Sequence, residues 1–288
     1  MAGHNKWSKI KHRKAVVDKR RGKVWTKCSK AIIVAAKNGG GDPTTNLALR
    51  YAIDEARYAN MPRETIERAI QKGAVGGTGE NYEPVRYEGY GPGGVAIIVD
   101  ALTDNRTRTV GDLRLAFGNH GGSLGNSGCV GYMFQPKGRI LVNAPGVGED
   151  RMMEIAIEAG ADDCVAPDDP NDEPWTILCA VSAFQSVKEA IERAGAAPAH
   201  TGGNPHAKAN ASAASTITIA EAEIAMVPSD TVEVRGEAAD TLGELIEAIE
   251  DLDDVQKVYT NAGYREPSVT RWWAHCRAGP RSVASGVP

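Results

Sequence analysis

The sequence lacks the features of a membrane protein, a secreted protein and a disulfide-rich protein. No segment of the 288 residues approaches the run of roughly 20 apolar residues that a transmembrane helix needs. No apolar stretch follows the first basic residues before Lys19, so we do not expect a secretory signal peptide. The five cysteines are odd in number and form no CxxC pair, which favours reduced, buried thiols and no zinc site. We therefore expect a cytoplasmic protein without a membrane partner.

Motifs for nucleotide binding and catalysis are also lacking. The segment from 89 to 94 (GYGPGG) satisfies GxGxxG, but a β-branched strand follows it where the dinucleotide fingerprint needs a helix. We interpret it as a turn between two strands. His120, Ser123, Ser127 and Cys129 lie close in sequence without a GxSxG elbow, and His120 is expected to end a helix. We expect no enzymatic activity, and therefore no catalytic residue, cofactor or metal.

Acidic residues are almost absent from the first thirty positions, where Asp18 stands alone. Eleven of the 33 Lys and Arg residues lie in this segment, so the remainder has 22 basic residues against 36 acidic ones. A basic end on an acidic body indicates a polyanionic partner, most commonly nucleic acid. Trp7, His12 and Trp25 stand among the basic residues, which suits phosphate contacts combined with stacking.

These observations define a predicted nucleic-acid interface at the N-terminus. Its residues are Lys6, Trp7, Lys9, Lys11, His12, Arg13, Lys14, Lys19, Arg20, Arg21, Lys23, Lys27 and Lys30. Two alternatives remain open: a solvated basic face, or a site for an acidic protein surface, including the acidic remainder of this chain. We expect Trp25 to pack in a helical core. The acidic residues from 250 to 254 are interpreted as a solvated helix end, with contact to a basic partner as the alternative.

Residues 1 to about 78 predict a helical bundle. One helix follows Gly22, because apolar residues recur there at helical spacing while lysines lie on the opposite side. It should end at 38–41, where an Asn-Gly-Gly-Gly run stops it. We expect a second helix from 42 to 60 and a third from 62 to 73. Three helices with short links form a small bundle.

Beyond a glycine-rich linker at 73–79, strands and helices alternate. Predicted strands are 95–101, 130–134, 139–142, 162–166, 175–181, 217–227, 231–235 and 254–260, and predicted helices are 106–117, 149–159, 182–194 and 238–250. Residues 135–138 are expected to form a turn. Hairpins between helices favour an α+β class over a purely parallel sheet. The order β-α-β-β-α-β over 139–227 is ferredoxin-like.

Several long strings in this sequence resemble the YebC/PmpR family. They are AGHNKW at 2–7, IKHRK at 10–14, NMP at 60–62, YEGYGPGG at 87–94, TDNR at 103–106 and DLDDVQKVYTN at 251–261. They occur in the order found in that family and span most of residues 2–264. The chain departs from the family in a longer run at 195–215 and in an extension at 265–288.

The resemblance implies a three-helix bundle followed by two α+β domains, the second of them ferredoxin-like and inserted in the first. The implied division is 1–78 for the bundle, 79–135 with 228–264 for the first α+β domain, and 136–227 for the inserted domain. Residues 265–288 would form an unstructured extension. No cofactor or catalytic residue belongs to the family.

The resemblance also implies a cytoplasmic regulatory protein, usually described as a transcriptional regulator that binds DNA. Other members, including the mitochondrial translational activator of cytochrome c oxidase, act on translation, and some bacterial members are thought to help ribosomes through proline-rich stretches. The alternative partner is therefore ribosomal RNA. Major-groove reading needs a helix that the sequence does not clearly offer, whereas binding RNA by shape needs charge.

Overall fold

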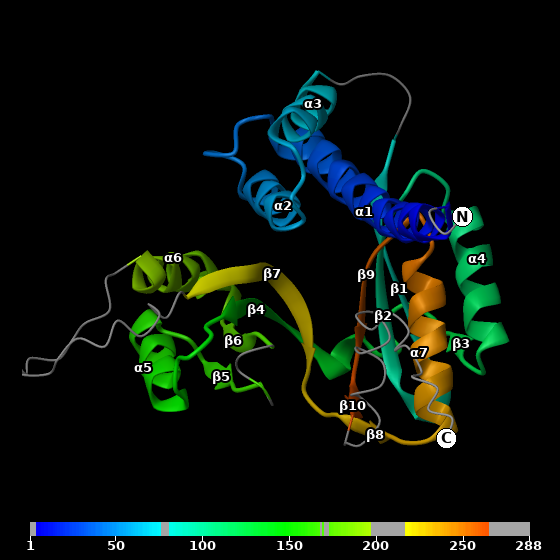
Figure 1. The fold of residues 1–288 in the computed structure, drawn as a ribbon. Helices are drawn as coiled ribbons and strands as arrows, with labels where there is room; N and C mark the ends of the chain where they lie inside the picture. The colour runs from blue at the N-terminus through cyan, green and yellow to red at the C-terminus, as the bar shows by residue number, and fades with distance from the viewer. Residues whose placement is uncertain (1–3, 76–80, 168, 170–172, 197–216, 265–288) are drawn as a thin grey trace, which may run out of the picture.

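The computed structural model describes residues 4–75, 81–167, 169, 173–196 and 217–264, with the backbone alone for 4–21, 196 and 264. The long run at 195–215 lies largely outside these residues, and the extension expected at 265–288 lies wholly outside them. The chain forms a helical bundle followed by two antiparallel sheets with helices, so the predicted α+β class is confirmed (Figure 1).

The bundle consists of α1 (His4–Gly39), α2 (Leu47–Tyr58) and α3 (Arg63–Ala74). The prediction that the second helix begins at 42 is wrong. The Asp42 carboxylate accepts a hydrogen bond from the Thr44 N–H at 2.9 Å and so holds a local turn. Asn46 then caps α2, because its side-chain oxygen accepts from the Leu49 N–H at 3.1 Å.

The core of the bundle is built from one apolar face of each helix. Cys28, Ile32 and Ala36 of α1 are buried against Leu49 of α2 and Ile66 of α3, together with further apolar residues of the same helices. All members of this core belong to residues 25–70. The bundle therefore has a hydrophobic core of its own.

Gly73 allows α3 to approach α1 closely. A Cβ at this position would lie 2.5 Å from the Ile33 carbonyl oxygen and 2.8 Å from the Ala36 Cβ. We expect Gly73→Ala to lower the free energy of unfolding by about 1–3 kcal/mol through overpacking. Gly111→Ala in a helix of the next domain is the control, since its Cβ would meet nothing within 4 Å; it should stabilise by up to about 1 kcal/mol. Urea unfolding followed by circular dichroism measures both, and equal effects would contradict the close-approach argument.

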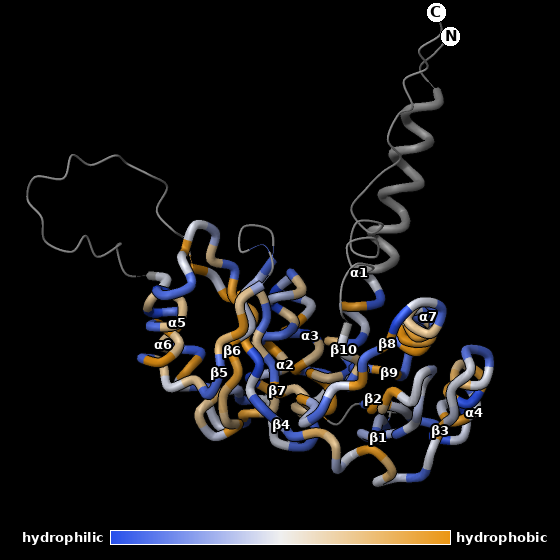
Figure 2. Tube along the Cα trace, turned by 90° about the horizontal axis from the view of Figure 1, so that it is seen from below, coloured by the Kyte–Doolittle hydropathy of each residue, from blue (hydrophilic) through white to orange (hydrophobic). Residues whose placement is uncertain are grey.

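The first sheet has the order β3-β1-β2-β9, from β1 (Glu83–Tyr90), β2 (Ala96–Thr103), β3 (Ser123–Leu124) and β9 (Val255–Thr260). Its apolar face packs against α4 (Arg106–Asn119) and α7 (Glu237–Glu250). Hydrophobic and hydrophilic residues alternate along α7 (Figure 2), as expected for a helix with one buried face. A short parallel pair, β8 (Val232–Val234) and β10 (Ala262–Tyr264), lies beside this unit.

The second sheet has the order β5-β6-β4-β7 and is antiparallel throughout. Its elements follow as β4 (Phe134–Asn143), α5 (Glu149–Ala159), β5 (Asp163–Val165), β6 (Trp175–Cys179), α6 (Phe184–Ala196) and β7 (Thr218–Pro228). This order and connectivity are ferredoxin-like. All six elements fall between β3 and β9 in the chain, so the second unit is inserted in the first.

The predicted turn at 135–138 is wrong, because β4 runs through it without a break. Pro136 pairs with Met226 of β7, whereas β6 joins β4 only from Gly138 onward. Pro136 therefore occupies a stretch with a single neighbouring strand, and such an edge position tolerates proline. The segment 89–94, in contrast, is a turn as predicted, since β1 ends at Tyr90 and pairs antiparallel with β2.

The cysteines in the described part of the chain are free thiols, as expected. Cys28, Cys164 and Cys179 are buried and Cys129 is half-buried, whereas Cys276 lies outside the described residues. Among the helices that the structure describes, none combines the length and the apolar character that crossing a bilayer requires.

Candidate nucleic-acid interface

All of the predicted nucleic-acid contacts lie on one element, α1, which at 36 residues is about 54 Å long. For most of them the structure describes the backbone alone, so their side-chain placement stays a prediction. These are Lys6, Trp7, Lys9, Lys11, His12, Arg13, Lys14, Lys19, Arg20 and Arg21. The backbone of α1 is helical from His4, so the basic N-terminus forms one continuous rod with the first helix of the bundle.

The other three, Lys23, Lys27 and Lys30, form a lysine face on α1 that contacts the chain's own acidic turn at 250–254. Lys23 Nζ lies 2.9 Å from a carboxylate oxygen of Asp251. Lys27 donates to the Glu250 carbonyl oxygen at 2.8 Å, and Lys30 donates to the Asp253 carbonyl oxygen at 2.9 Å. The structure thus shows the alternative that the sequence left open, a contact with the acidic remainder of the chain.

This contact buries charge, and the pKa values reflect it. Burial lowers the pKa of Lys27, although the nearby Glu250 carboxylate opposes the shift. Burial likewise raises the pKa of Glu250, against the effect of Lys27. Each group is therefore less easily charged here than in water, so this part of the contact is only weakly favoured.

Asp254 connects the lysine face to the first sheet and α4. One of its carboxylate oxygens lies 3.3 Å from Lys30 Nζ, and the other accepts from Arg108 Nη2 at 2.7 Å. The hydroxyl oxygens of Thr103 and Thr109 lie 3.1 and 3.0 Å from the second oxygen. Burial raises the pKa of Asp254, but these hydrogen bonds outweigh burial and hold the pKa below its usual value.

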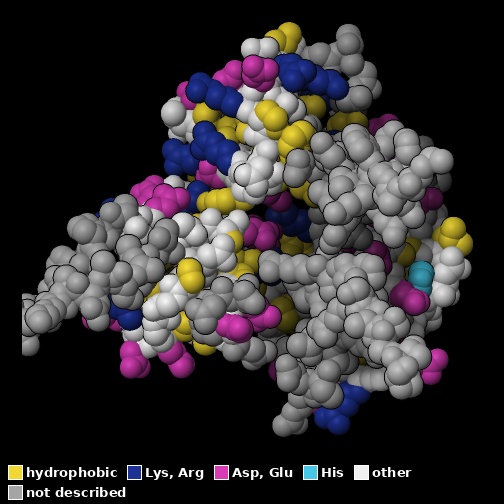
Figure 3. All heavy atoms as spheres, in the orientation of Figure 1, with side chains coloured by type: hydrophobic (Ala, Val, Ile, Leu, Met, Phe, Trp, Pro, Cys, Tyr) yellow, Lys and Arg dark blue, Asp and Glu magenta, His cyan; other side chains and the backbone are white. Residues whose placement is uncertain are grey.

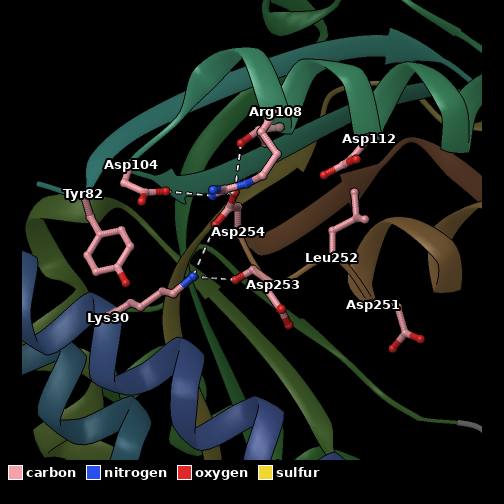
Figure 4. A pocket seen from close by; sticks show the side chains of 10 residues that line it. Lys30, Tyr82, Asp104, Arg108, Asp112, Asp251, Leu252, Asp253 and Asp254 are labelled. Carbon is pink, nitrogen blue, oxygen red and sulfur yellow. Dashed lines mark hydrogen bonds and ion pairs between the residues drawn. The ribbon is translucent and has the colours of Figure 1, made fainter. Parts of the chain in front are cut away.

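A polar pocket of about 530 Å³ lies at this junction (Figure 4). Lys30 reaches into it from α1 and Arg108 from α4, and five aspartates contribute carboxylates to its wall. The Tyr82 ring closes one side, 5.0 Å from Lys30 Nζ. Since Arg108 also bonds to Asp104 at 2.7 Å, both cations in this pocket have carboxylate partners.

Trp25 packs in the bundle as predicted. It lies against the bundle core, and its indole N–H donates to the Ala59 carbonyl oxygen at 3.0 Å. Its ring therefore helps to pack α1 against α2.

His120, which the sequence places among possible catalytic residues and at the end of a helix, follows the last residue of α4. Its Nδ1 lies 2.8 Å from the Ala116 carbonyl oxygen.

Two further ionic contacts join the bundle to the sheets. Asp54 of α2 pairs with Lys188 of α6 at 2.5 Å, and both side chains are nearly buried. Glu55 of α2 lies 3.1 Å from Lys257 of β9, which also pairs with Glu223 of β7. Burial lowers the pKa of Lys257, but the two glutamates outweigh burial and raise it.

Sequence reasoning missed these junction residues and one buried acid in the first sheet, Glu88. The carboxylate of Glu88 accepts from the backbone N–H groups of Gly128, Val130 and Gly131 at 2.9, 2.8 and 2.7 Å. Its only visible signal in the sequence is its place in the glycine-rich string at 87–94. The residues that pair the bundle with the sheets (Asp54, Glu55, Lys188 and Lys257) gave no such signal, because their partners lie far away in the sequence.

Two family models match this chain over most of its length. The model described as TACO1/YebC protein N-terminal domain matches residues 5–76, and the one described as TACO1/YebC second and third domain matches 82–213 and 206–262. These matched regions correspond to the bundle and to the two sheets with their helices.

Similar proteins cover nearly the whole chain. A protein from Burkholderia ambifaria and one from Cupriavidus necator, each named "probable transcriptional regulatory protein", are 49% identical over 262 residues, which is 91% of this chain and 98% of each relative. A crystal structure of a conserved hypothetical protein from Aquifex aeolicus is 42% identical with a TM-score of 0.74, covering 88% of this chain and 94% of that one. With domain matches and relatives of this extent, the chain belongs to the TACO1/YebC family.

Proposed function

We propose that this protein is a regulator that binds duplex DNA through the basic half of α1 and acts by binding, without catalysis. The observation that carries the proposal is the charge distribution: eleven basic residues and one acidic residue in the first thirty, ahead of an acidic remainder. Such a helix neutralises phosphates, whereas the acidic sheets are repelled by them. The names of the relatives, which describe transcriptional regulators, support the same role.

Ribosomal RNA is the second candidate, and the exposed face of α3 favours it. The helices α2 and α3 are joined by residues 59–62, a link as short as that of a helix-turn-helix. The exposed face of α3 nevertheless carries Glu64 and Glu67 beside Arg63 and Arg68, and Arg63 pairs with Glu67 at 2.7 Å. Lys and Arg side chains gather over the bundle together with acidic ones (Figure 3). Acidic residues on a reading helix oppose entry into the major groove, whereas RNA bound by shape requires no such helix.

Cross-linking in cells distinguishes the two partners. The protein is cross-linked to nucleic acid, purified under denaturing conditions, and the bound DNA and RNA are sequenced. Promoter DNA without ribosomal RNA would support transcriptional regulation and exclude the ribosomal role. Ribosomal RNA without promoter DNA would contradict the proposed DNA function and establish the second candidate.

Charge reversal in the basic helix tests the predicted contacts. We expect the quadruple change of Lys9, Lys11, Arg13 and Lys14 to Glu to weaken binding of a 30-base-pair duplex by at least about tenfold. The slope of log affinity against log salt should also fall by about four, one for each lost phosphate contact. Fluorescence anisotropy at several salt concentrations measures both quantities.

The matched control applies the same change of net charge to exposed arginines elsewhere. These are Arg114, Arg151, Arg193 and Arg235, changed to Glu. This variant should retain most of the affinity and the salt slope, and circular dichroism should show both variants folded. Equal loss of affinity in the two variants would show that only overall charge matters, and the site assignment would be wrong.

A further inference from the structure

The acidic turn presents to the lysine face of α1 the same acceptor chemistry that a phosphate would present. Lys23, Lys27 and Lys30 contact two carboxylates and the carbonyl oxygens of residues 250, 251 and 253. These carbonyls lie at and just beyond the C-terminal end of α7, where the helix dipole is negative. Carboxylate oxygens and carbonyl oxygens at the negative end of α7 therefore bind the three ammonium groups of the lysine face.

The bundle is placed so that this contact can open. Its hydrophobic core lies wholly within residues 25–70, so the fold of the bundle does not depend on the turn. Among the described residues the bundle meets the sheets through ion pairs (the lysine face, Glu55–Lys257 and Asp54–Lys188) and through Tyr51 and Tyr58 of α2, which pack against the core of the inserted domain. The apolar packing belongs to α2, whereas α1 meets the acidic turn through charged and hydrogen-bonding groups. Where such contacts are exposed, they weaken in salt and in the presence of competing charges.

Burial differs along the contact. The side chains of Lys23 and Asp251 are 32% and 71% exposed, whereas those of Lys30 and Asp254 are 12% and 10% exposed. An exposed pair contributes little and is readily screened. The contact between the lysine face and the acidic turn can therefore open first at Lys23. On that side α1 continues into its most basic segment.

We propose that the acidic turn at 250–254 is an intramolecular competitor that holds the lysine face of α1 until nucleic acid displaces it. The inference rests on the proposed function and adds regulation to the same site. Nucleic acid binding then shifts the protein from a docked to a released state of α1, because phosphates interact with the lysines only in the released state. The apparent affinity of the free protein is therefore the affinity of the released state multiplied by the fraction of molecules in which α1 is released.

Zero-length cross-linking measures the docked state directly. A carbodiimide joins Lys23 to Asp251 by an amide bond only while the two groups are in contact. The Lys137–Asp162 pair, 3.8 Å apart in the inserted domain, is the internal reference. We expect mass spectrometry to show that a saturating 30-base-pair DNA duplex, or a 30-nucleotide RNA hairpin, lowers the Lys23–Asp251 product at least about fivefold and leaves the reference unchanged.

A variant of the turn provides a second measurement. Asp251→Lys with Asp253→Lys replaces two exposed carboxylates by ammonium groups and repels the lysine face. We expect this variant to bind the same probes about fivefold more tightly than the control, Glu154→Lys with Glu158→Lys, which makes an equal change of charge on α5. Circular dichroism verifies that both fold.

The outcomes separate the inference from the function on which it rests. Binding with an unchanged Lys23–Asp251 product, or with equal affinity in the two double variants, overturns the competitor role and leaves the proposed function standing. If neither probe binds the wild type or the turn variant, the proposed function and the inference both fail. A lower cross-link yield on binding, together with tighter binding by the turn variant, establishes the competitor.

Discussion

Replacing Asp254 with alanine is expected to destabilise the folded protein by about 3–5 kcal/mol, the cost typical of breaking a buried ion pair from one side. Asp254 is 7% exposed, and its carboxylate accepts hydrogen bonds from Arg108 and Lys30 as well as from two threonine hydroxyls. Its loss leaves the Lys30 ammonium, itself mostly buried, without its carboxylate partner. Urea unfolding monitored by circular dichroism gives the free energy directly.

The neighbouring residue provides the control. Asp253 is exposed, and its contact with Lys30 uses the backbone oxygen, which a substitution retains. We therefore expect Asp253→Ala to change stability by less than about 0.5 kcal/mol. If the two alanine variants lost similar stability, the role assigned to the Asp254 carboxylate would be refuted.

The pH dependence of stability provides an independent measure of the same carboxylate. The pKa of Asp254 is lower in the folded protein than its usual value, so the folded state favours the charged form. The stabilisation is complete above the unfolded pKa of about 4 and is lost as the pH falls through the lower folded pKa. The wild type should therefore lose its stability advantage over Asp254→Asn in acid, and an advantage that is constant with pH would contradict the ionic role.

The elements of this fold could be predicted from sequence where a periodic pattern is buried on one side. The helices α5 and α7 and the strand β6 show such patterns, whereas β2 is a continuous apolar run buried on both faces, and the structure places all four within a few residues of the predictions. Prediction failed where local chemistry competes with the pattern. Asp42 holds a turn where a helix start was expected, and Pro136 fits inside β4 because β6 ends beside Gly138. A short pairing strand such as β3, two residues long, carries too little pattern to be found.

The candidate site was predictable only as a concentration of charge on one segment. The sequence shows the sign and the density of charge and predicts a helix only after Gly22, whereas the structure places all of these basic residues on α1. It does not show which of them already have partners, because Lys23 and Asp251 are separated by 228 positions. The acidic run at 250–254 appears solvated when it is considered alone, and it becomes a partner of α1 only after the sheet brings the end of α7 to the bundle. Long-range pairing of this kind follows from topology, which local patterns do not encode.

Substituting Glu88 by glutamine is expected to destabilise the protein by about 3 kcal/mol, although the side chain keeps its size. The carboxylate accepts three backbone N–H bonds, from Gly128, Val130 and Gly131, and is almost fully buried. A glutamine has one acceptor oxygen, and its amide group would face at least one backbone donor with another donor. A buried donor without a partner costs about 1–3 kcal/mol, and hydrogen bonds to a charged group are the stronger kind.

The pKa of Glu88 and the local exchange of amides identify the cause of that loss. Burial raises the pKa of Glu88, but the three backbone N–H groups outweigh burial and lower it, so the charged form is the one that the loop at 128–131 binds.

Hydrogen exchange should therefore accelerate at the Val130 amide in Glu88→Gln before the whole protein unfolds. Glu83→Gln on the same strand is the matched control, since its pair with Arg106 is exposed and should contribute less than about 1 kcal/mol. An unchanged exchange rate at Val130 would mean that the loop is held by its own packing. Faster exchange confined to 128–131 would instead show that one buried carboxylate organises the segment leading into β4, the strand through which the inserted domain is joined to the first sheet.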